Sequence, residues 1–188
     1  MIELRVYGRP APQGSKERRG HGAVVESSKC VKPWRSDVRD AAEQVVLYDY
    51  PSGERALAPG YPLHGPLVVS MVFTFVRPKG HYRTGRNAHL LRDSVPARPH
   101  GTPDLSKLAR STEDALTSAG VWEDDARVVE YARLAKVWAS EDPEALGAPG
   151  AVIRIWRLDE LAACTHGGDC PVHPDAGGLH NYDPKGTT

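Results

Sequence analysis

The segment that most constrains the fold of this chain is LVVSMVFTFV, residues 67–76. Its apolar character is nearly continuous, whereas a strand with one solvated face alternates between apolar and polar residues. We therefore expect residues 67–76 to form a strand in the interior of a sheet. Near the N-terminus, Ile2, Leu4 and Val6 do alternate with polar residues, which predicts a strand with one buried face.

Two helices and two further strands are expected. Pro33 fits the first position of one helix. Residues 104–119 should form a second helix, because apolar and small side chains recur there at helical spacing and make a stripe that can pack on the sheet. The stripe comprises Leu105, Leu108, Ala109, Thr112, Ala115 and Leu116. The remaining strands are expected over residues 128–138 and 151–158.

Loops separate these elements. Residues 9–32 should form a loop or hairpin, residues 49–65 are rich in turn formers, and residues 77–102 form a long Arg-rich loop. We predict an α/β (α+β) fold, a mixed sheet of about four strands packed by two main helices. Residues 1–158 should form this domain, and residues 159–188 a C-terminal tail.

Composition favours a soluble protein. Of the 188 residues, 40% are hydrophobic and 26% charged, as is usual for one globular domain. No apolar run approaches the ~20 residues that span a bilayer, and MIELRVYG lacks the apolar core of a signal peptide. Three cysteines do not suggest a disulfide framework, so we expect a location in the reducing cytoplasm and no membrane partner.

The net charge of zero conceals an uneven distribution. Residues 1–100 contain 16 Lys/Arg against 9 Asp/Glu, and residues 101–188 contain 8 against 15. The first part could attract phosphates, and the second concentrates carboxylates that suit hard cations. An unevenly charged, solvated surface is the alternative explanation.

Residues 103–140 contain the groups with the clearest chemical meaning. Asp104 precedes the first turn of the second predicted helix, and Arg110 lies on the polar face of that helix. Each has an ordinary structural explanation: Asp104 could cap the helix, and Arg110 could pair with Asp114 at i,i+4. Together they could also hold a divalent metal beside a phosphodiester, provided that a further carboxylate approaches the helix.

The turn after this helix supplies two candidates, Asp124 and Asp125. Gly120 should end the helix and allow a tight return, which brings the turn back towards it. Adjacent like charges are unfavourable unless water or a metal neutralises them. Because neighbouring side chains in a turn point in different directions, we expect only one to be a direct ligand. A solvated acidic turn is the alternative.

The segment PDLSKLARSTEDALTSAGVWEDDARVVEY, residues 103–131, resembles the RusA-type Holliday junction resolvases. Weaker resemblance to phage and prophage members from actinobacteria extends it over about residues 1–158, through GRPAPQGSK, KPWRSDVRDAA and RPKGHYRTGRNAHLLRDS. The resemblance implies a mixed α/β homodimer that resolves four-way DNA junctions with Mg²⁺, by paired nicks in recombination and repair. Mn²⁺ is a second candidate cation.

The resemblance also implies roles for individual residues. Asp104 and Asp125 would bind the metal, and Asp124 would support or share that site. Arg110 falls where the family has a catalytic lysine or arginine, and would hold the scissile phosphate. Ser106 departs from the pattern, because the family has a second aspartate there.

The departure at Ser106 leaves activity open. Serine removes one negative charge from the metal site, which should lower cation affinity. Glu113 is a candidate partial substitute on nearly the same helical face, but ~10 Å further along the axis. The alternative function is therefore a catalytically impaired protein that binds junctions without cleaving them.

Contacts to DNA are expected mainly from basic loops, and such contacts would be largely independent of base sequence. The predicted residues are Arg9, Lys16, Arg18, Arg19, Arg77, Lys79, Arg83 and Arg86. His81 and Tyr82 lie among them and could stack on unpaired bases. The alternative is a solvated, flexible loop.

The tail contains a second candidate metal site. Cys164, His166, Cys170 and His173 have the ligand types of a Zn²⁺ site, although their spacing is unusually tight. A disordered tail is the alternative. If the tail does bind zinc, the protein could instead be an adaptor that acts through it.

Overall fold

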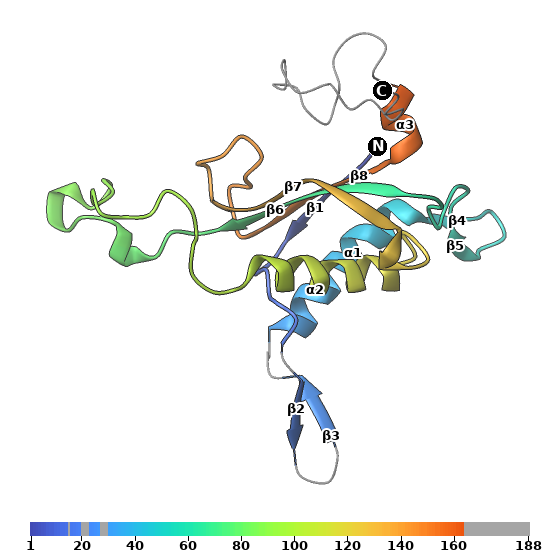
Figure 1. The fold of residues 1–188 in the computed structure, drawn as a ribbon, viewed down its shortest axis with the longest axis horizontal. Coiled ribbons are helices and arrows are strands. Elements are labelled where there is room, and N and C mark those ends of the chain that lie inside the picture. The colour runs from blue at the N-terminus through green and yellow to red at the C-terminus, as the bar shows by residue number, and fades with distance from the viewer. Residues whose placement is uncertain (15, 20–22, 27–29, 164–188) are drawn as a thin grey trace, which may run out of the picture.

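The computed structural model describes residues 1–14, 16–19, 23–26 and 30–163, and its centre is a four-stranded sheet (Figure 1). The strand order is β1-β8-β6-β7, with β1 at Ile2–Tyr7, β8 at Gly150–Arg157, β6 at Leu67–Phe75 and β7 at Val128–Trp138. β6 is parallel to β7, and the other pairs are antiparallel. The mixed sheet predicted from the sequence is therefore confirmed.

Strand β6 is internal, as its apolar run predicts. Every residue from Leu67 to Thr74 is buried. Alternate residues Leu67, Val69, Met71 and Phe73 join the main hydrophobic core, so the residues between them face the other side of the sheet. A strand flanked by two neighbours and covered on both faces has no solvated side, which explains the missing alternation.

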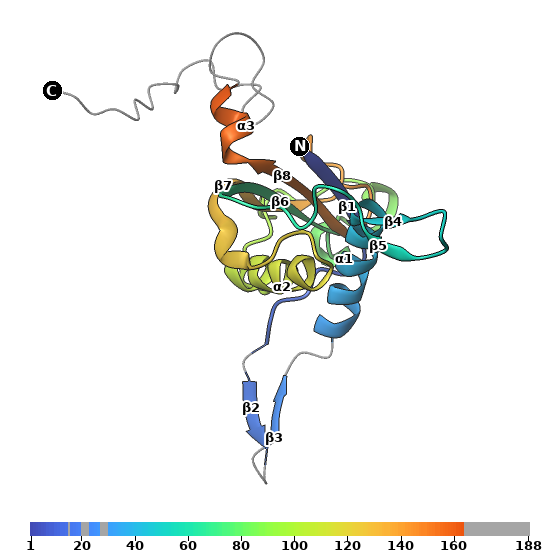
Figure 2. The same cartoon turned by 90° about the vertical axis from the view of Figure 1, so that its right-hand side faces the viewer.

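Two helices cover one face of the sheet: α1 (Val31–Val46) and α2 (Leu105–Ser118) (Figures 1 and 2). The predicted stripe of α2 faces the core, with Leu105 partly buried and the other five residues buried. Helix α1 begins at Val31, two residues before the predicted start at Pro33. Pro33 is therefore the third helical residue. Proline is tolerated there as at the first position, because neither backbone N–H has a partner within the helix.

Trp34 of α1 joins the two helices. Its side chain is fully buried, and its indole N–H donates to Thr112 Oγ1 of α2 at 3.2 Å. We expect Trp34→Phe to lower the free energy of unfolding by about 2 kcal/mol, from lost ring contacts and the lost hydrogen bond. Urea unfolding of Trp34→Phe, Thr112→Val and the double variant measures the coupling. Strictly additive effects would contradict a direct bond between the two side chains.

Short elements complete the described fold. They are β2 (Lys16–Arg19), β3 (Ala23–Glu26), β4 (Leu47–Asp49), β5 (Arg55–Leu57) and α3 (Leu158–Ala163). β2 and β3 pair as an antiparallel hairpin that extends away on the helical side (Figure 2). The β4–β5 hairpin begins just before residues 49–65, for which the sequence indicated only turns, and α3 opens the predicted tail. None of the helices described is both long and apolar enough to cross a bilayer.

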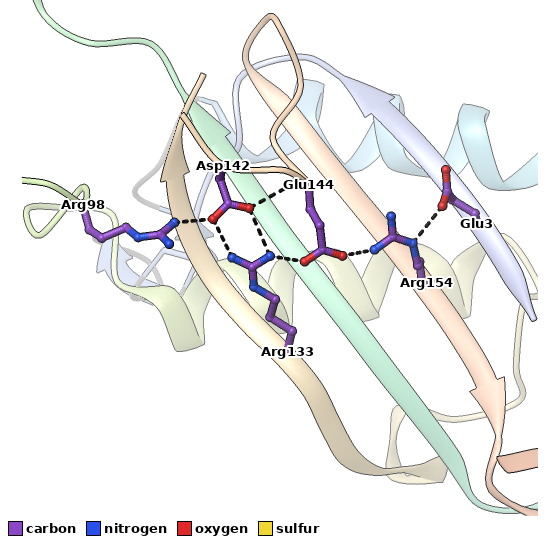
Figure 3. Close-up of polar contacts among 6 residues, drawn as sticks. All are labelled: Glu3, Arg98, Arg133, Asp142, Glu144 and Arg154. Atoms are coloured by element: carbon purple, nitrogen blue, oxygen red, sulfur yellow. Dashed lines mark hydrogen bonds and ion pairs between the residues drawn. The ribbon is translucent and has the colours of Figure 1, made fainter. Parts of the chain in front are cut away.

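Charged side chains cross the sheet face that is turned away from the helices (Figure 3). Asp142, whose side chain is only 3% exposed, accepts hydrogen bonds from Arg98 at 2.7 Å and from Arg133 of β7. Glu144 lies between Arg133 and Arg154 of β8 and pairs with both. Arg154 continues the series to Glu3 of β1. The loop between β7 and β8 is thereby fastened across three strands.

Candidate functional site

Helix α2 presents the first candidate residue, Asp104, at its N-terminus. Because β6 and β7 are parallel, α2 runs back between them and starts beyond the carboxyl end of β6. Asp104 takes the N-cap position, but its carboxylate caps no backbone N–H. The carboxylate instead pairs with Lys107 Nζ at 2.9 Å and is 55% exposed. Its oxygens are therefore open to water and to a ligand.

Lys136 of β7 holds the segment that leads into Asp104. Its ammonium donates to the carbonyl oxygens of Gly101 at 2.6 Å and Pro103 at 2.9 Å. The role of Lys136 was not predicted from the sequence, because a lysine within a strand usually extends into solvent. The distance of 33 residues between Lys136 and Pro103 gives no local signal of the contact.

The two adjacent aspartates in the turn after α2 differ in their contacts. Gly120, at φ +78°, ends the helix as predicted, and the indole N–H of buried Trp122 donates to Thr117 Oγ1 at 2.7 Å. Asp124 Oδ1 accepts from the backbone N–H of Ala126 at 2.8 Å and caps a single 3₁₀ turn. Asp125 is exposed, and its carboxylate forms no hydrogen bond or ion pair with the described residues; only its backbone carbonyl accepts a bond, from the Val128 N–H. One aspartate thus shapes the turn, and the other remains available.

Glu113 of α2, the candidate partial substitute for the missing aspartate, is buried, which the sequence did not indicate. It is only 8% exposed, and its carboxylate accepts a hydrogen bond from the Tyr131 hydroxyl of β7. Burial raises the pKa of Glu113 above its usual value; the Tyr131 bond opposes this, while the nearby charges of Asp125 and Asp114 raise the pKa further. Burial and the Glu113 carboxylate likewise raise the pKa of the Tyr131 phenol.

The 3₁₀ turn that begins at Asp125 packs against α2, the helix that carries Glu113 and Arg110. Asp125 acts on both Glu113 and Tyr131, and Arg110 acts on Glu113 with the opposite sign. Asp104 lies nine residues before Glu113 on α2, ~14 Å along the helix axis. Nowhere in residues 1–14, 16–19, 23–26 and 30–163 do three or more His, Cys, Asp or Glu side chains gather as a ready metal site.

The available donors nevertheless suit a hard divalent cation. Asp104 and Asp125 offer carboxylate oxygens that no backbone N–H occupies. Mg²⁺ commonly keeps several waters and takes its remaining ligands from one or two carboxylates and from phosphate oxygens. Ser106 is exposed on α2 and adds a hydroxyl but no charge. Asp104 and Asp125 therefore each offer donors of the type that suits a cation coordinated mainly by water and substrate.

A basic arm, residues 77–100, projects from the carboxyl end of β6 (Figure 1). Lys79, Arg83 and Arg86 are exposed on it. Arg83 connects parts of the arm, because its guanidinium binds Asp93 at 2.8 Å and the Leu91 carbonyl at 3.1 Å. The arm thus presents exposed cationic groups, one of which takes part in contacts within the arm.

Arg77, at the root of the arm, has a different environment. It is 7% exposed, pairs with Glu141 (Nη2–Oε2 2.6 Å) and donates to the Pro96 carbonyl at 3.1 Å. Its guanidinium lies 4.9 Å from the centroid of the Trp138 ring, against which His81 packs edge-on. Arg77 therefore links both ends of the arm to β7 and to the loop after it. The His81 ring already packs against Trp138.

The structure describes the remaining residues predicted to bind DNA or Zn²⁺ in less detail. Arg9 is exposed in the loop after β1. Lys16, Arg18 and Arg19 belong to β2, of which the structure describes the backbone. The four tail residues proposed for Zn²⁺, Cys164, His166, Cys170 and His173, lie outside the described residues.

Comparison with known proteins agrees with the resemblance seen in the sequence. The family model "Endodeoxyribonuclease RusA" matches residues 8–146, which include α1, the basic arm, α2 and the acidic turn. A search of curated proteins finds no match for this chain. Members of the matched family are endonucleases that act on branched DNA junctions and generally depend on a divalent metal. With the match covering well over half of its length, the chain belongs to the family of RusA-type Holliday junction resolvases.

Proposed function

We propose that this protein is a Mg²⁺-dependent endonuclease that resolves four-way DNA junctions by paired, symmetric nicks during recombination and repair in the cytoplasm. The observation that carries the proposal is that the carboxylates of Asp104 and Asp125 bind no backbone N–H. Both residues lie in the helix–turn region that the family model matches. Two copies related by a two-fold axis would match the symmetry of the junction and place one site on each of two opposing strands.

In this proposal each residue has a distinct task. Asp104 and Asp125 would hold the cation, and Asp124 keeps the turn in shape by capping it. When bound, such a cation activates water and neutralises charge on the phosphate. Arg110, exposed on the same helix, would bind a phosphate oxygen and offset the negative charge that develops during cleavage. The basic arm would grip the DNA backbone in a salt-dependent manner.

The test is a nicking assay on a synthetic four-way junction, a flap and a plain duplex. The unchanged protein with Mg²⁺ should introduce symmetric nicks in the junction and leave the duplex largely intact. Binding without nicking, in saturating Mg²⁺ or Mn²⁺, would instead support the second candidate, a junction-binding protein with an impaired site. The observation that favours this second candidate is Ser106, which brings no carboxylate to the exposed face of α2.

Ser106→Asp should raise the nicking rate. The added carboxylate would increase cation affinity at a position that is already exposed, so we expect an increase of roughly tenfold at limiting Mg²⁺. Ser106→Asn supplies a side chain of the same size without charge and serves as the control. Equal rates for the two variants and the unchanged protein, with folding intact, would show that charge at position 106 does not limit the reaction.

A further inference from the structure

The burial of the Glu113 carboxylate is unfavourable for the stability of the fold. Its carboxylate has one neutral donor, the Tyr131 hydroxyl, and no ion pair with any Lys, Arg or His of the described residues. Removing a carboxylate from water without a cationic partner destabilises a fold. Residues that break this rule cluster at functional sites, because the charge serves a ligand rather than the core.

Glu113 shares a face of α2 with Ser106, the position at which the family has an aspartate that this chain lacks. Ser106 and Glu113 are seven residues apart, so they lie on nearly the same face of α2, two turns from each other. The turn that carries Asp125 packs against α2, and Asp125 acts electrostatically on Glu113 and on Tyr131. The chain thus lacks an acidic side chain at position 106 and has one, two turns later, close to Asp125.

The charges around Glu113 favour a cation. Glu113 and Asp125 repel each other, and the low polarity around a buried carboxylate strengthens that repulsion. Arg110 compensates only in part, since Asp114 adds to the repulsion. A divalent cation held by Asp125 would relieve it. The Tyr131 hydroxyl, which crosses from β7, fixes the carboxylate in place.

We propose that Glu113, oriented by Tyr131, is a positioning residue that acts through Asp125 and supplies the negative charge that Ser106 does not. This inference rests on the proposed function, because it assumes that Asp125 holds a divalent cation. It assigns the cation affinity of the site to a residue for which the family resemblance predicts no role.

The first test measures cation affinity in the full chain without DNA. Glu113→Gln removes the charge and keeps an oxygen that accepts the Tyr131 hydroxyl. Binding of Mn²⁺, followed by electron paramagnetic resonance, and of Ca²⁺, followed by calorimetry, should weaken about tenfold, as for other groups that support a metal ligand. Glu130→Gln, an exposed residue of β7, is the matched control and should bind as the unchanged protein does.

Two further variants separate this role from a structural one. Ser106→Asp combined with Glu113→Gln should regain most of the lost affinity, which a defect in packing would not allow. Tyr131→Phe should lower affinity about threefold, because the charge remains but loses its orientation. In the absence of cation, Glu113→Gln should unfold at the same temperature as the unchanged protein or at a higher one, since a buried charge has been removed.

The outcomes are decisive in either direction. Unchanged Mn²⁺ affinity in Glu113→Gln, failure of Ser106→Asp to restore it, or absence of Mn²⁺ binding by the unchanged protein would overturn the role of Glu113. If the unchanged protein binds Mn²⁺ with an affinity that depends on Glu113 but does not nick a junction, the positioning role stands and the proposed nuclease function fails.

Discussion

Asp125→Asn is expected to lower the rate of junction nicking at least about 100-fold, because it removes the carboxylate best placed to hold the cation. Asparagine has the same shape, and the Asp125 carboxylate forms no hydrogen bond or ion pair with the described residues, so the fold should be unaffected. The rate is measured under single-turnover conditions in Mg²⁺. Binding of the junction is measured separately in Ca²⁺, and we expect it to be retained within about threefold.

Asp124→Asn is the matched control for this experiment. The Asn side-chain oxygen can still accept the Ala126 N–H, so the 3₁₀ turn should keep its cap and its shape. We expect nicking to fall by less than about tenfold. A loss as large as that of Asp125→Asn would show that both carboxylates hold the cation, and the division of roles between cap and ligand would be wrong.

Arg77→Met should destabilise the protein by about 2 kcal/mol and weaken DNA binding through the position of the arm. The substitution leaves Glu141 without its partner, and the Pro96 carbonyl keeps only its bond from the Trp138 indole N–H. The contact with Trp138 also loses its cation. Because Glu141 is 37% exposed, water can solvate the carboxylate that is left behind, which limits the loss of stability. Urea unfolding measures the loss of stability, and a binding titration at several salt concentrations measures the effect on DNA.

Arg86→Met distinguishes this anchoring role from a direct contact. Arg86 is exposed on the same arm, so its loss should leave the unfolding free energy unchanged. If Arg86 binds a phosphate, the slope of log affinity against log salt should fall by about one unit. For Arg77→Met we expect weaker binding with the slope retained. A stable Arg77→Met variant with a reduced slope would make Arg77 a phosphate contact instead.

The main elements of the fold could be predicted because their patterns are local. Strand β7 occupies the predicted residues 128–138, and α2 lies within the predicted 104–119. Hydrophobic periodicity and the glycine that ends the helix specify these elements without knowledge of the rest of the chain. The β4–β5 hairpin was missed because each of its strands has only three residues, too few to show a period.

The candidate site was predictable only in part. Asp104 and the acidic turn could be found from their order along the chain. The burial of Glu113 could not, because it depends on Tyr131 of a neighbouring strand, 18 residues away. Arg77 resembled a solvated loop arginine, since Glu141 and Trp138 lie more than 60 residues further along the chain. Long-range partners decide whether a charged side chain is a surface group or an internal anchor.

The pairing of β1 with β8 has a consequence for how the protein is made. Ile2 lies opposite Ile155, and β6 pairs only with the two strands that follow it in the chain. A ribosome that adds about 5–20 residues per second therefore exposes β1 for roughly 10–30 s before its neighbour emerges. During that interval the nascent chain presents unpaired apolar strands, a state that favours aggregation and chaperone binding.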